Sequence, residues 1–454
     1  MRIVLVGAGA AGSLVLLDLA RRVAAGQRGA GPWEVTVLDP ADPVTGAAFG
    51  TTDPRHLLNV PAAGMSADPE DRFDFSQWCV ERGLVDADDA SYWFAPRREW
   101  ARYMRERLEA ALVGAGERLH VSRVHSEAVG FDRVGDLVEV RTGTGQVLLA
   151  DRVVVATGLP AVGDDWSPVD LSGPRYVADP WRPGALAELG AGDGDVVVVG
   201  TGLTMVDVAL SVLDRPGRRV VALSRSGDLP HPHAPAYLGE VVPDTRSWGA
   251  SLAEIVAAAH AHTSAVAQLQ GDWRPGIDGI RYRVADLWAR LGEADRTTFL
   301  REFSRAWGVR RHRMPPSSAS TLASAAAEGR LEVRAAKVSD VDLHPDGVEV
   351  TTADGRRIRA GWLVNCTGPR PDLRTLANPA LDALLGIGGG TPWARTDGLG
   401  LGLRTRDGRL TDPVGIEAPV WTLGALRRGE LWESTAIPEI RVQAREVAGA
   451  LLAE

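Results

Sequence analysis

The stretch Arg2-Ile-Val-Leu-Val-Gly7-Ala-Gly9-Ala-Ala-Gly12-Ser13 decides the fold. Its first part, Ile3 to Val6, is a continuous apolar run, which is typical of a strand buried on both faces of a parallel sheet. The glycines spell G-x-G-x-x-G, and a helical period follows them. Gly7 permits a tight turn, Gly9 lets the backbone approach a pyrophosphate, and Gly12 lets the helix lie close to the strand. We therefore predict a dinucleotide-binding unit whose helix N-terminus faces the phosphates.

The next apolar strand supports this interpretation. Val35 to Leu38 ends in Asp39, and an acid at that place accepts hydrogen bonds from a ribose. A glycine motif alone is a weak signal, but a strand before it, a helix after it and an acid at the end of the second strand make it specific. We expect Gly7, Gly9, Ala11, Gly12 and Asp39 to contact the dinucleotide.

Composition limits the classes of protein that remain. The chain has 454 residues, which is enough for two or three domains, and its net charge of −9 argues against a general nucleic-acid surface. Cys79 and Cys366 lie far apart, so neither a C-x-x-C disulfide nor a cysteine metal site is expected. The sequence has no apolar run of membrane-spanning length, and its first residues already form a core strand. We expect a cytoplasmic protein without a metal, a membrane or a nucleic-acid partner.

A second version of the opening begins at Val196. The strand Val196 to Val199 leads into Gly200-Thr-Gly202-Leu203-Thr204-Met205, where methionine replaces the third glycine. The following strand ends in Ser224-Arg225 rather than in an acid. An acid there repels a 2′-phosphate and an arginine attracts one, so NADPH is favoured over NADH. The residues expected to bind it are Gly200, Gly202, Leu203, Thr204, Ser224 and Arg225.

Each glycine unit is followed by a hairpin pattern and an apolar strand that ends in Thr-Gly, at Thr157-Gly158 and again at Thr367-Gly368. This duplication predicts an α/β fold with two nested Rossmann-like domains. The expected divisions are 1–180 and 366–454 for the outer domain, 190–235 and 330–365 for the inner domain, and 236–329 for a mostly helical insertion. In the tail, 398–403 and 420–423 are expected as strands, before a last helix that begins near Ser434.

The segment 46–67 has neither a helical nor a strand period, although it contains Leu57, Leu58, Val60 and Met65. A loop of this kind inside a compact domain is usually functional. It either wraps the inner end of a bound cofactor or forms a structured surface loop.

Nested dinucleotide folds, the outer with an acid and the inner with an arginine, resemble two-domain flavoprotein oxidoreductases. The chain is similar to the FAD/NAD(P)-binding family typified by the bacterial YdhS-like proteins. The segments that carry this resemblance are His56-Leu-Leu-Asn59-Val-Pro61-Ala-Ala-Gly-Met65-Ser66, Gly200-Thr-Gly202-Leu-Thr204-Met-Val-Asp207, Arg311-His312-Arg313, Asn365-Cys-Thr-Gly368-Pro369 and Leu431-Trp-Glu433-Ser-Thr-Ala-Ile-Pro438-Glu439-Ile-Arg441.

The resemblance implies FAD in the outer domain and NADPH in the inner one, and points to flavin-dependent N-oxygenases of amino acids or amines. Such enzymes form a flavin C4a-hydroperoxide from O2. The residues it places near FAD are Asn59, Met65, Thr157, Gly158, Gly424, Thr435 and Ala436, and it places Gly368 near NADPH. The strand that ends Thr422-Leu-Gly424-Ala lacks the Gly-Asp of disulfide reductases, so backbone N–H groups are expected to serve there.

Candidate substrate residues lie in the insertion and just before it. His231, His233 and His312 either bind substrate and move protons or are simply solvated. Arg311, with Arg310 and Arg313, either holds a carboxylate or a phosphate or forms a solvated basic loop. The sequence identifies no catalytic base.

Two functions remain open. The first is an NADPH- and O2-dependent monooxygenase that N-oxygenates a small molecule. The second is an FAD-containing NADPH reductase or oxidase that passes electrons to a quinone or a protein partner. A redox sensor without enzymatic activity is a more distant alternative, and a homo-oligomer is possible. The absence of C-x-x-C removes the usual thiol acceptor and favours the first function.

Overall fold

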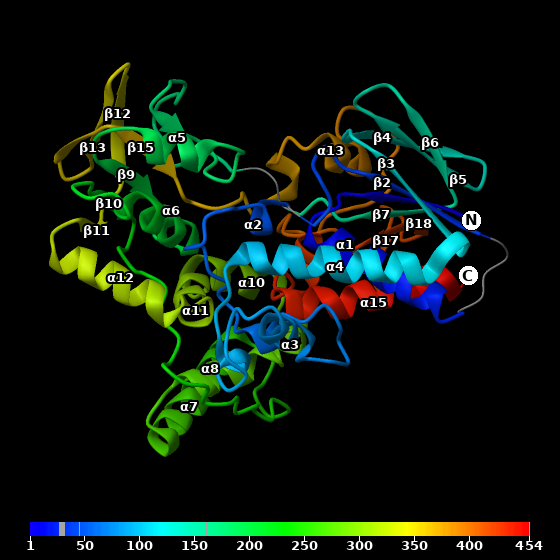
Figure 1. Cartoon of the computed structure of the whole chain (residues 1–454), viewed down its shortest axis with the longest axis horizontal. Coiled ribbons are helices and arrows are strands. Elements are labelled where there is room, and N and C mark those ends of the chain that lie inside the picture. Colours follow the sequence, from blue (N-terminus) through cyan, green and yellow to red (C-terminus); the bar gives the residue numbers. More distant parts are fainter. Residues whose placement is uncertain (27–31, 45, 159–161, 454) are drawn as a thin grey trace.

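The computed structural model describes residues 1–26, 32–44, 46–158 and 162–453. Two parallel sheets lie at opposite ends of the molecule (Figure 1). The outer sheet has the order β16-β17-β18-β7-β1-β2-β3. Its strands are β1 (Arg2–Val6), β2 (Trp33–Leu38), β3 (Leu119–Val124), β7 (Arg152–Val155), β16 (Thr405–Arg406), β17 (Arg409–Thr411) and β18 (Glu417–Thr422). The pairs β16–β17 and β17–β18 are antiparallel, and the other pairs of this sheet are parallel.

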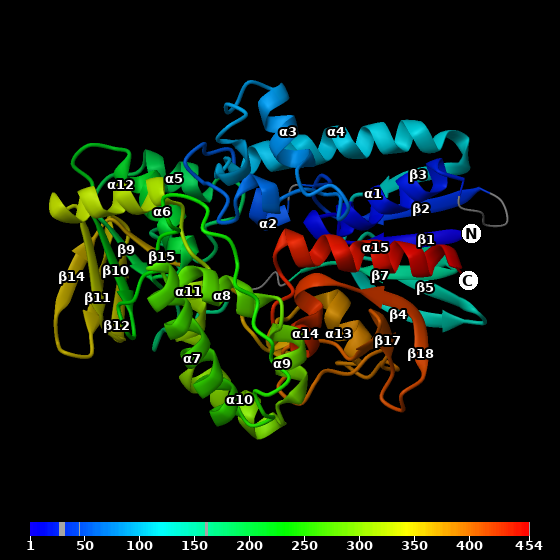
Figure 2. The ribbon, with the colours of Figure 1, turned by 90° about the horizontal axis from the view of Figure 1, so that it is seen from below.

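Both faces of the outer sheet are covered, which explains why β1 is apolar throughout. Ile3 and Leu5 pack against α1 (Ala10–Ala24), α4 (Arg97–Ala115) and α15 (Ile437–Ala453), the layer that Figure 2 shows beside β1 and β2. Val4 and Val6 pack on the opposite face against the antiparallel strands and one helix. These elements are β4 (Ala128–Val134), β5 (Leu137–Thr142), β6 (Val147–Ala150) and α13 (Pro379–Leu385).

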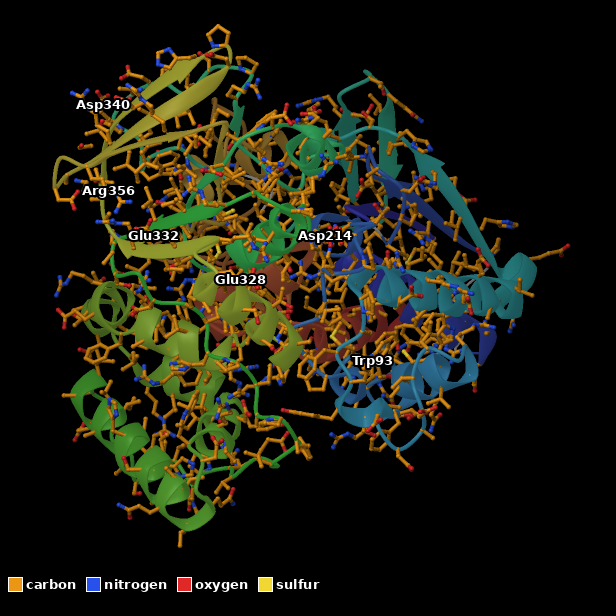
Figure 3. All side chains as sticks on the ribbon, turned by 60° about the vertical axis from the view of Figure 1, so that its left-hand side comes forward. Trp93, Asp214, Glu328, Glu332, Asp340 and Arg356 are labelled. Carbon is orange, nitrogen blue, oxygen red and sulfur yellow. The ribbon has the colours of Figure 1, made fainter. Side chains whose placement is uncertain are left out.

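The inner domain repeats this arrangement. Its parallel sheet has the order β11-β10-β9-β15-β8. The strands are β8 (Tyr176–Val177), β9 (Val196–Val199), β10 (Val220–Ser224), β11 (Leu331–Ala335) and β15 (Trp362–Asn365). One face packs against α5 (Ala185–Ala191), α6 (Leu203–Leu213) and α12 (Pro316–Ala327), and the other against β12 (Val338–His344), β13 (Gly347–Thr352) and β14 (Arg357–Ala360). An ion pair between Glu332 and Arg356 joins β11 to this second layer (Figure 3). The two nested Rossmann-like folds are thus confirmed.

The helical insertion consists of α7 (Leu252–Gln270), α8 (Arg274–Arg281), α9 (Val284–Arg290), α10 (Glu293–Glu302) and α11 (Ser304–Arg311). It packs on the tail of the outer domain through Trp432, whose ring stacks on Trp288 at 5.0 Å between centroids. The Trp288 indole also donates to the Gly429 carbonyl beside α14 (Arg428–Leu431), at 2.9 Å. The insertion is therefore tied to the segment that leads into α15.

Three details differ from the expectations. α12 falls in the range assigned to the insertion, but its Leu322 and Ala325 pack in the core of the inner domain. β8 falls in the range assigned to the outer domain but pairs with β15. The strand expected at 398–403 was wrong: the Asp397 carboxylate accepts from the N–H groups of Leu399 and Gly402, which holds this segment as a turn.

The remaining short helices of the described chain are α2 (Gly46–Phe49), α3 (Asp74–Glu81) and the 3-10 turns Ala62–Gly64, Ala90–Tyr92, Gly116–Arg118, Leu373–Thr375 and Gly424–Arg427.

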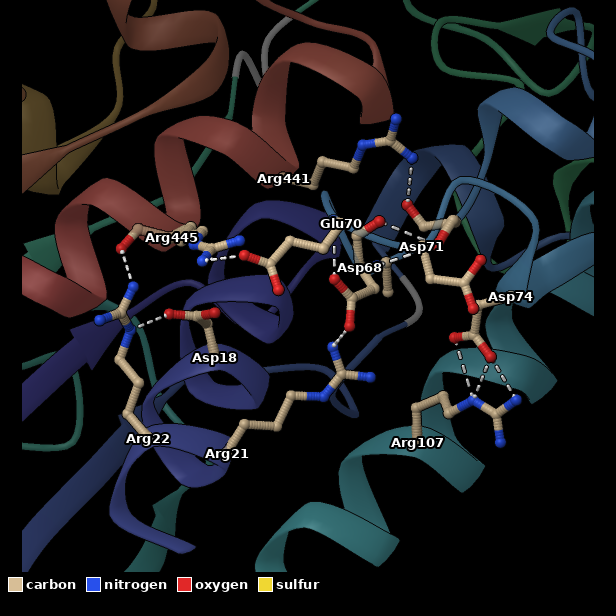
Figure 4. A network of polar contacts seen from close by, with 12 residues as sticks. Asp18, Arg21, Arg22, Asp68, Glu70, Asp71, Asp74, Arg107, Arg441 and Arg445 are labelled. Carbon is tan, nitrogen blue, oxygen red and sulfur yellow. Dashed lines mark hydrogen bonds and ion pairs between the residues drawn. The ribbon is translucent and has the colours of Figure 1, made fainter. Parts of the chain in front are cut away.

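A polar network holds the loop after Met65 against the helical layer. Arg441 of α15 donates to the Ser66 carbonyl at 2.9 Å, and Arg445 pairs with Glu70 at 2.6 Å (Figure 4). Arg21 of α1 pairs with Asp68 at 3.1 Å. These contacts position Met65.

The two domains meet through buried polar groups on α6. Arg97 of α4 pairs with Asp207 at 2.7 Å, and their side chains are 14% and 6% exposed. His56 is fully buried and lies 2.8 Å from the Ser211 hydroxyl, which donates to Asp53 at 2.6 Å. Burial lowers the pKa of His56 to about 4 and raises that of Asp207 to about 6, although Arg97 acts in the opposite direction on Asp207. Charged and polar pairs thus fix α6 against the outer domain.

The raised pKa of Asp207 predicts a pH-dependent contribution to stability. Because the fold favours the protonated carboxyl, this contribution is present below the unfolded pKa and is lost as the pH rises through about 6. We expect the unfolding free energy of the protein, relative to that of Asp207→Asn, to fall by roughly 2–4 kcal/mol between pH 4 and pH 7. Urea unfolding across this range tests it.

Asp214→Asn is the matched control, because Asp214 follows the same helix and its side chain is 62% exposed. Asp214→Asn should change the unfolding free energy by less than about 1 kcal/mol, as is usual for exposed ion pairs. If the difference in unfolding free energy between the unchanged protein and Asp207→Asn does not vary with pH, the raised pKa of Asp207 is contradicted.

Candidate functional site

A cavity of about 670 Å³ opens at the carboxyl ends of β1, β2 and β7. This is the place where open α/β sheets bind their ligands. One end of the cavity is formed by the Gly7 turn and Asp39, and the other by Met65 and the start of α15. Its length therefore runs from the first βα turn to the N-terminus of the last helix.

The three glycines of the first turn have the roles that the sequence predicted. Gly7 has φ +91°, and a Cβ there would lie 2.6 Å from the Ala156 carbonyl oxygen. A Cβ on Gly12 would collide with the Gly7 carbonyl. At Gly9 the nearest atom to a Cβ would be Gly46 Cα, at 3.8 Å, so the space beside Gly9 belongs to the cavity. The turn thus leaves room for a phosphate where Gly9 faces it.

Asp39 closes the second strand as predicted and supports the turn. Its carboxylate accepts from the N–H groups of Ala8 at 2.6 Å and Ala41 at 2.7 Å. Each oxygen keeps a second lone pair, and the residue lines the cavity, so a ribose hydroxyl can still donate to it.

The groups around this cavity fit FAD. The Thr157 hydroxyl is buried in the cavity wall and has no hydrogen-bond partner within the described residues. The first N–H groups of α1 face the cavity, where a pyrophosphate accepts from them. The predicted residues in the wall are Gly7, Gly9, Ala11, Asp39, Asn59, Met65, Thr157, Gly158, Thr435 and Ala436. Gly12 lies behind the wall, and so does Gly424, whose N–H donates to Gln443 at 3.0 Å.

The segment 46–67 contributes a wall of this cavity as well as a contact with α6. Phe49, Leu58, Asn59 and Met65 line the cavity. The Asn59 carbonyl lies 3.0 Å from Nε2 of His233. Burial lowers the pKa of His233 to about 3, so its neutral ring donates to this carbonyl. His233 thereby ties the start of the insertion to the cavity wall.

A second cavity, of about 980 Å³, opens at the carboxyl ends of β9, β10 and β15. Gly200 has φ +103°, and a Cβ there would collide with the Cys366 carbonyl, whereas beside Gly202 nothing lies within 4 Å. The inner turn therefore repeats the geometry of the outer one. Every residue predicted for NADPH lines it: Gly200, Gly202, Leu203, Thr204, Ser224, Arg225 and Gly368.

Cations gather at the Ser224 end of the second cavity. The side chains of Arg225 and Lys337 are exposed and make no hydrogen bond or ion pair within the described part of the chain. Arg305 of α11 pairs with Asp228 at 2.9 Å and reaches Ser224 Oγ at 3.5 Å. This end fits a 2′-phosphate. The sequence analysis missed Arg305 and Lys337, although Lys337, the only lysine of the chain, was a signal in the sequence itself.

The two cavities meet at the start of α6, because Leu203 lines both. His312 lines the second cavity and lies 3.6 Å from the Glu433 carboxylate. Glu433 also accepts from the Trp307 indole at 2.8 Å. Burial alone would raise the pKa of Glu433, but its contact with His312 and the charge of Arg311 lower it instead. A buried, ionised carboxylate thus marks the junction.

Two of the predicted substrate residues, Arg311 and His231, line neither cavity. Arg311 is buried, and its Nε lies 3.9 Å from Glu433 Oε2. His231 is exposed, contacts the edge of Trp273 and lines neither of the two cavities. Within the described residues, no group of three or more His, Cys, Asp or Glu could hold a metal ion. No described helix is long and apolar enough to cross a membrane.

Comparison with known proteins agrees with this architecture. Residues 4–160 match the family model described as FAD-NAD(P)-binding. No curated protein matches the chain in sequence. The first 160 residues thus contain an FAD/NAD(P)-binding domain, and the more specific YdhS-like resemblance stays a prediction.

Solved structures share the whole fold. Ornithine hydroxylase from Pseudomonas aeruginosa is 14% identical with a TM-score of 0.65, over 99% of this chain and 98% of that one. L-lysine 6-monooxygenase from Pseudomonas syringae is 18% identical with a TM-score of 0.64, over 100% and 99%. Ornithine N-hydroxylase from Kutzneria sp. 744, solved with reduced FAD, NADP+ and L-ornithine, is 18% identical with a TM-score of 0.62, over 99% and 98%. The chain therefore has the fold of flavin-dependent enzymes with two dinucleotide domains.

Substitution of Gly9 should separate FAD binding from folding. Because only cavity space surrounds a Cβ at this position, Gly9→Val should fold and yet purify without the yellow flavin. Absorbance and thermal unfolding measure the two properties. Gly12→Ala is the contrasting variant, since its methyl group meets the backbone of the turn, and it should lower the melting temperature. A yellow Gly9→Val protein with normal FAD content would contradict the site.

The free cations at Ser224 predict the coenzyme preference. Arg225→Gln and Lys337→Gln should each raise the KM for NADPH about tenfold or more, because each removes a charge-assisted contact, and should change that for NADH much less. Steady-state NAD(P)H oxidation by the FAD-loaded protein tests this. Arg215→Gln, at the opposite end of α6, is the control. Equal losses for both coenzymes would exclude a role in 2′-phosphate binding.

Proposed function

We propose that the protein is an FAD-dependent monooxygenase that uses NADPH and O2 to N-oxygenate a small amine or amino acid. The observation that carries the proposal is the meeting of the two cavities at Leu203, with α11 of the insertion forming a wall of the second cavity. Hydride transfer between two dinucleotides needs this proximity, and a covered junction keeps water away from reactive oxygen species.

The reaction balances as R-NH2 + O2 + NADPH + H+ giving R-NHOH + H2O + NADP+. Bound FAD would supply the redox chemistry, since it accepts a hydride and passes two electrons to oxygen. The chain's own groups bind, orient and shield. The N-terminus of α15, with Thr435 and Ala436 in the FAD cavity, offers unpaired N–H groups that stabilise negative charge on a reduced cofactor.

The inner-domain residues would hold NADPH with its reactive end towards Leu203. Ser224, Arg225 and Lys337 lie at one end of the cavity and favour the 2′-phosphate. The activities of the similar proteins, hydroxylation of ornithine and lysine, support the N-oxygenase interpretation. The limits 1–180 with 366–454, and 190–235 with 330–365, remain our proposal for the two domains, modified by the positions of β8 and α12.

The reductase or oxidase alternative has less support from the described side chains. Cys79 and Cys366 are both free and buried. Burial raises the pKa of the Cys79 thiol to about 12 and that of Cys366 well above its usual value, so neither is a reactive thiolate that exchanges with the disulfide of a redox partner.

Coupled turnover distinguishes the two functions. With FAD-loaded protein and NADPH, amines and amino acids are screened for stimulated NADPH oxidation, and hydroxylated amine and H2O2 are quantified. We expect one substrate class to stimulate oxidation and to yield about one hydroxylated product per NADPH. If every amine gives stoichiometric H2O2, or if a quinone accepts the electrons rapidly without any amine, the reductase or oxidase function replaces the proposal.

A further inference from the structure

Arg311 is a buried cation without a hydrogen-bond acceptor. It is the last residue of α11 and is 7% exposed. Its guanidinium makes no hydrogen bond to any described residue, and its Nε is buried and unpartnered. The 3.9 Å separation from Glu433 is an ion pair but too long for a hydrogen bond. The Nε–H group is one of the five donors of a guanidinium, and its burial without an acceptor is costly.

The other buried arginines have the hydrogen-bond acceptors that Arg311 lacks. Within the described residues, five arginines are buried, and four of them have hydrogen-bond acceptors. Arg313, two residues after Arg311, donates to both oxygens of Asp278 at 2.7 and 2.6 Å. Arg152, Arg218 and Arg427 donate to Leu451, to Leu189 and Gly194, and to Glu430. Arg311 is the exception, so the fold does not itself use its donors.

More positive charge surrounds Arg311. Burial lowers its pKa, and the neighbouring charge of Arg281 lowers it further. Arg441, whose side chain points from α15 towards the loop at Ser66 in Figure 4, also has a buried Nε without a partner. The carboxylates whose charges act on Arg311 are Glu433, Glu439 and Asp278. Glu439 Oε1 accepts from Arg281 at 2.5 Å, and Asp278 pairs with Arg313 at 2.6 Å. The guanidinium groups of Arg281, Arg311, Arg313 and Arg441 thus exceed these three carboxylates by one charge.

The position of this group matches a substrate site. His312, the next residue, lines the second cavity, and Glu433 comes two residues before Thr435 of the FAD cavity. Ile440, which follows Glu439, also lines the FAD cavity. Arg311 itself lines neither cavity, but its neighbour His312 and its ion-pair partner Glu433 connect it to the residues that line both.

We propose that Arg311 binds a carboxylate of the substrate and that the excess of positive charge selects an amine of net negative charge, such as a dicarboxylic amino acid. This inference rests on the proposed function. The second buried donor, Arg441 Nε, and the unpartnered Oε2 of Glu439 offer further polar contacts for a carboxylate and an amino group. A diamine brings no acceptor for Arg311, and a diamino acid brings an extra positive charge towards Arg281.

Binding without turnover tests the inference separately from catalysis. Oxidised, FAD-loaded protein is titrated with succinate, a dicarboxylate that has no amino group, and with cadaverine, while the flavin absorbance and binding heat are measured. Succinate should bind, and Arg311→Met should weaken this binding about tenfold to a hundredfold, since charge-assisted hydrogen bonds are lost. Thermal unfolding of Arg311→Met is measured in parallel, because the substitution also removes the ion-pair partner of Glu433.

Arg310→Gln is the matched control, because Arg310 is exposed and donates only to Ala306 of its own helix. It should bind succinate as the unchanged protein does. If Arg311→Met melts lower, Arg311→Lys provides the second test, since it keeps the charge without the bidentate fork and should bind with intermediate affinity.

The failures can be told apart. If succinate binds equally to Arg311→Met, or if cadaverine binds better than succinate, the inference is wrong. If Arg311-dependent succinate binding is present and no amine is hydroxylated, the anion site stands and the monooxygenase proposal fails. If amines are hydroxylated but lysine and ornithine exceed aspartate and glutamate, the monooxygenase stands and the selection of anionic substrates is refuted.

Discussion

The buried ion pair between Arg97 and Asp207 is the contact on which the arrangement of the two cavities depends. It joins α4 of the outer domain to α6 of the inner one, and α6 begins at Leu203, the residue that lines both cavities. Breaking such a pair leaves an uncompensated charge, so the relative position of the domains is more strongly constrained than surface contacts alone would achieve. The same burial raises the pKa of Asp207, because it disfavours the negative charge that pairs with Arg97.

Local sequence rules predicted the parts of this structure that depend on local geometry. Gly7 and Gly200 adopt positive φ and approach a neighbouring strand so closely that no side chain fits, and the sequence motif encodes this requirement directly. Apolar runs such as Ile3 to Val6 predicted strands buried on both faces, since each face meets its own helical or antiparallel layer. The nested order of the two units followed from the repeated Thr-Gly strand ends.

What the sequence did not reveal depends on contacts between distant segments. Arg305 of α11 reaches Ser224, and Lys337, in the loop after β11, lines the same cavity. The sequence around these two residues does not show that they meet there. The segment after Asp397 has strand-like composition, but a side-chain carboxylate satisfies its N–H groups and so replaces a ladder. The role of α12 was also hidden, because its small apolar residues match a helix of the insertion as well as one that covers β11.

Helix α11 joins the Ser224 end of the second cavity to the buried ion pair of Arg311 with Glu433. Its eight residues span about 12 Å at the usual rise of an α-helix, with Arg305 near Ser224 and Arg311 at the last position. Gly308 and Val309, between them, line the second cavity. An NADPH molecule would therefore contact α11 along its length, and it would hold Arg311 in place through a helix that it also touches at Arg305. NADPH in the second cavity and the anion proposed for Arg311 would both contact this one helix, so each would stabilise the position of α11 that the other needs.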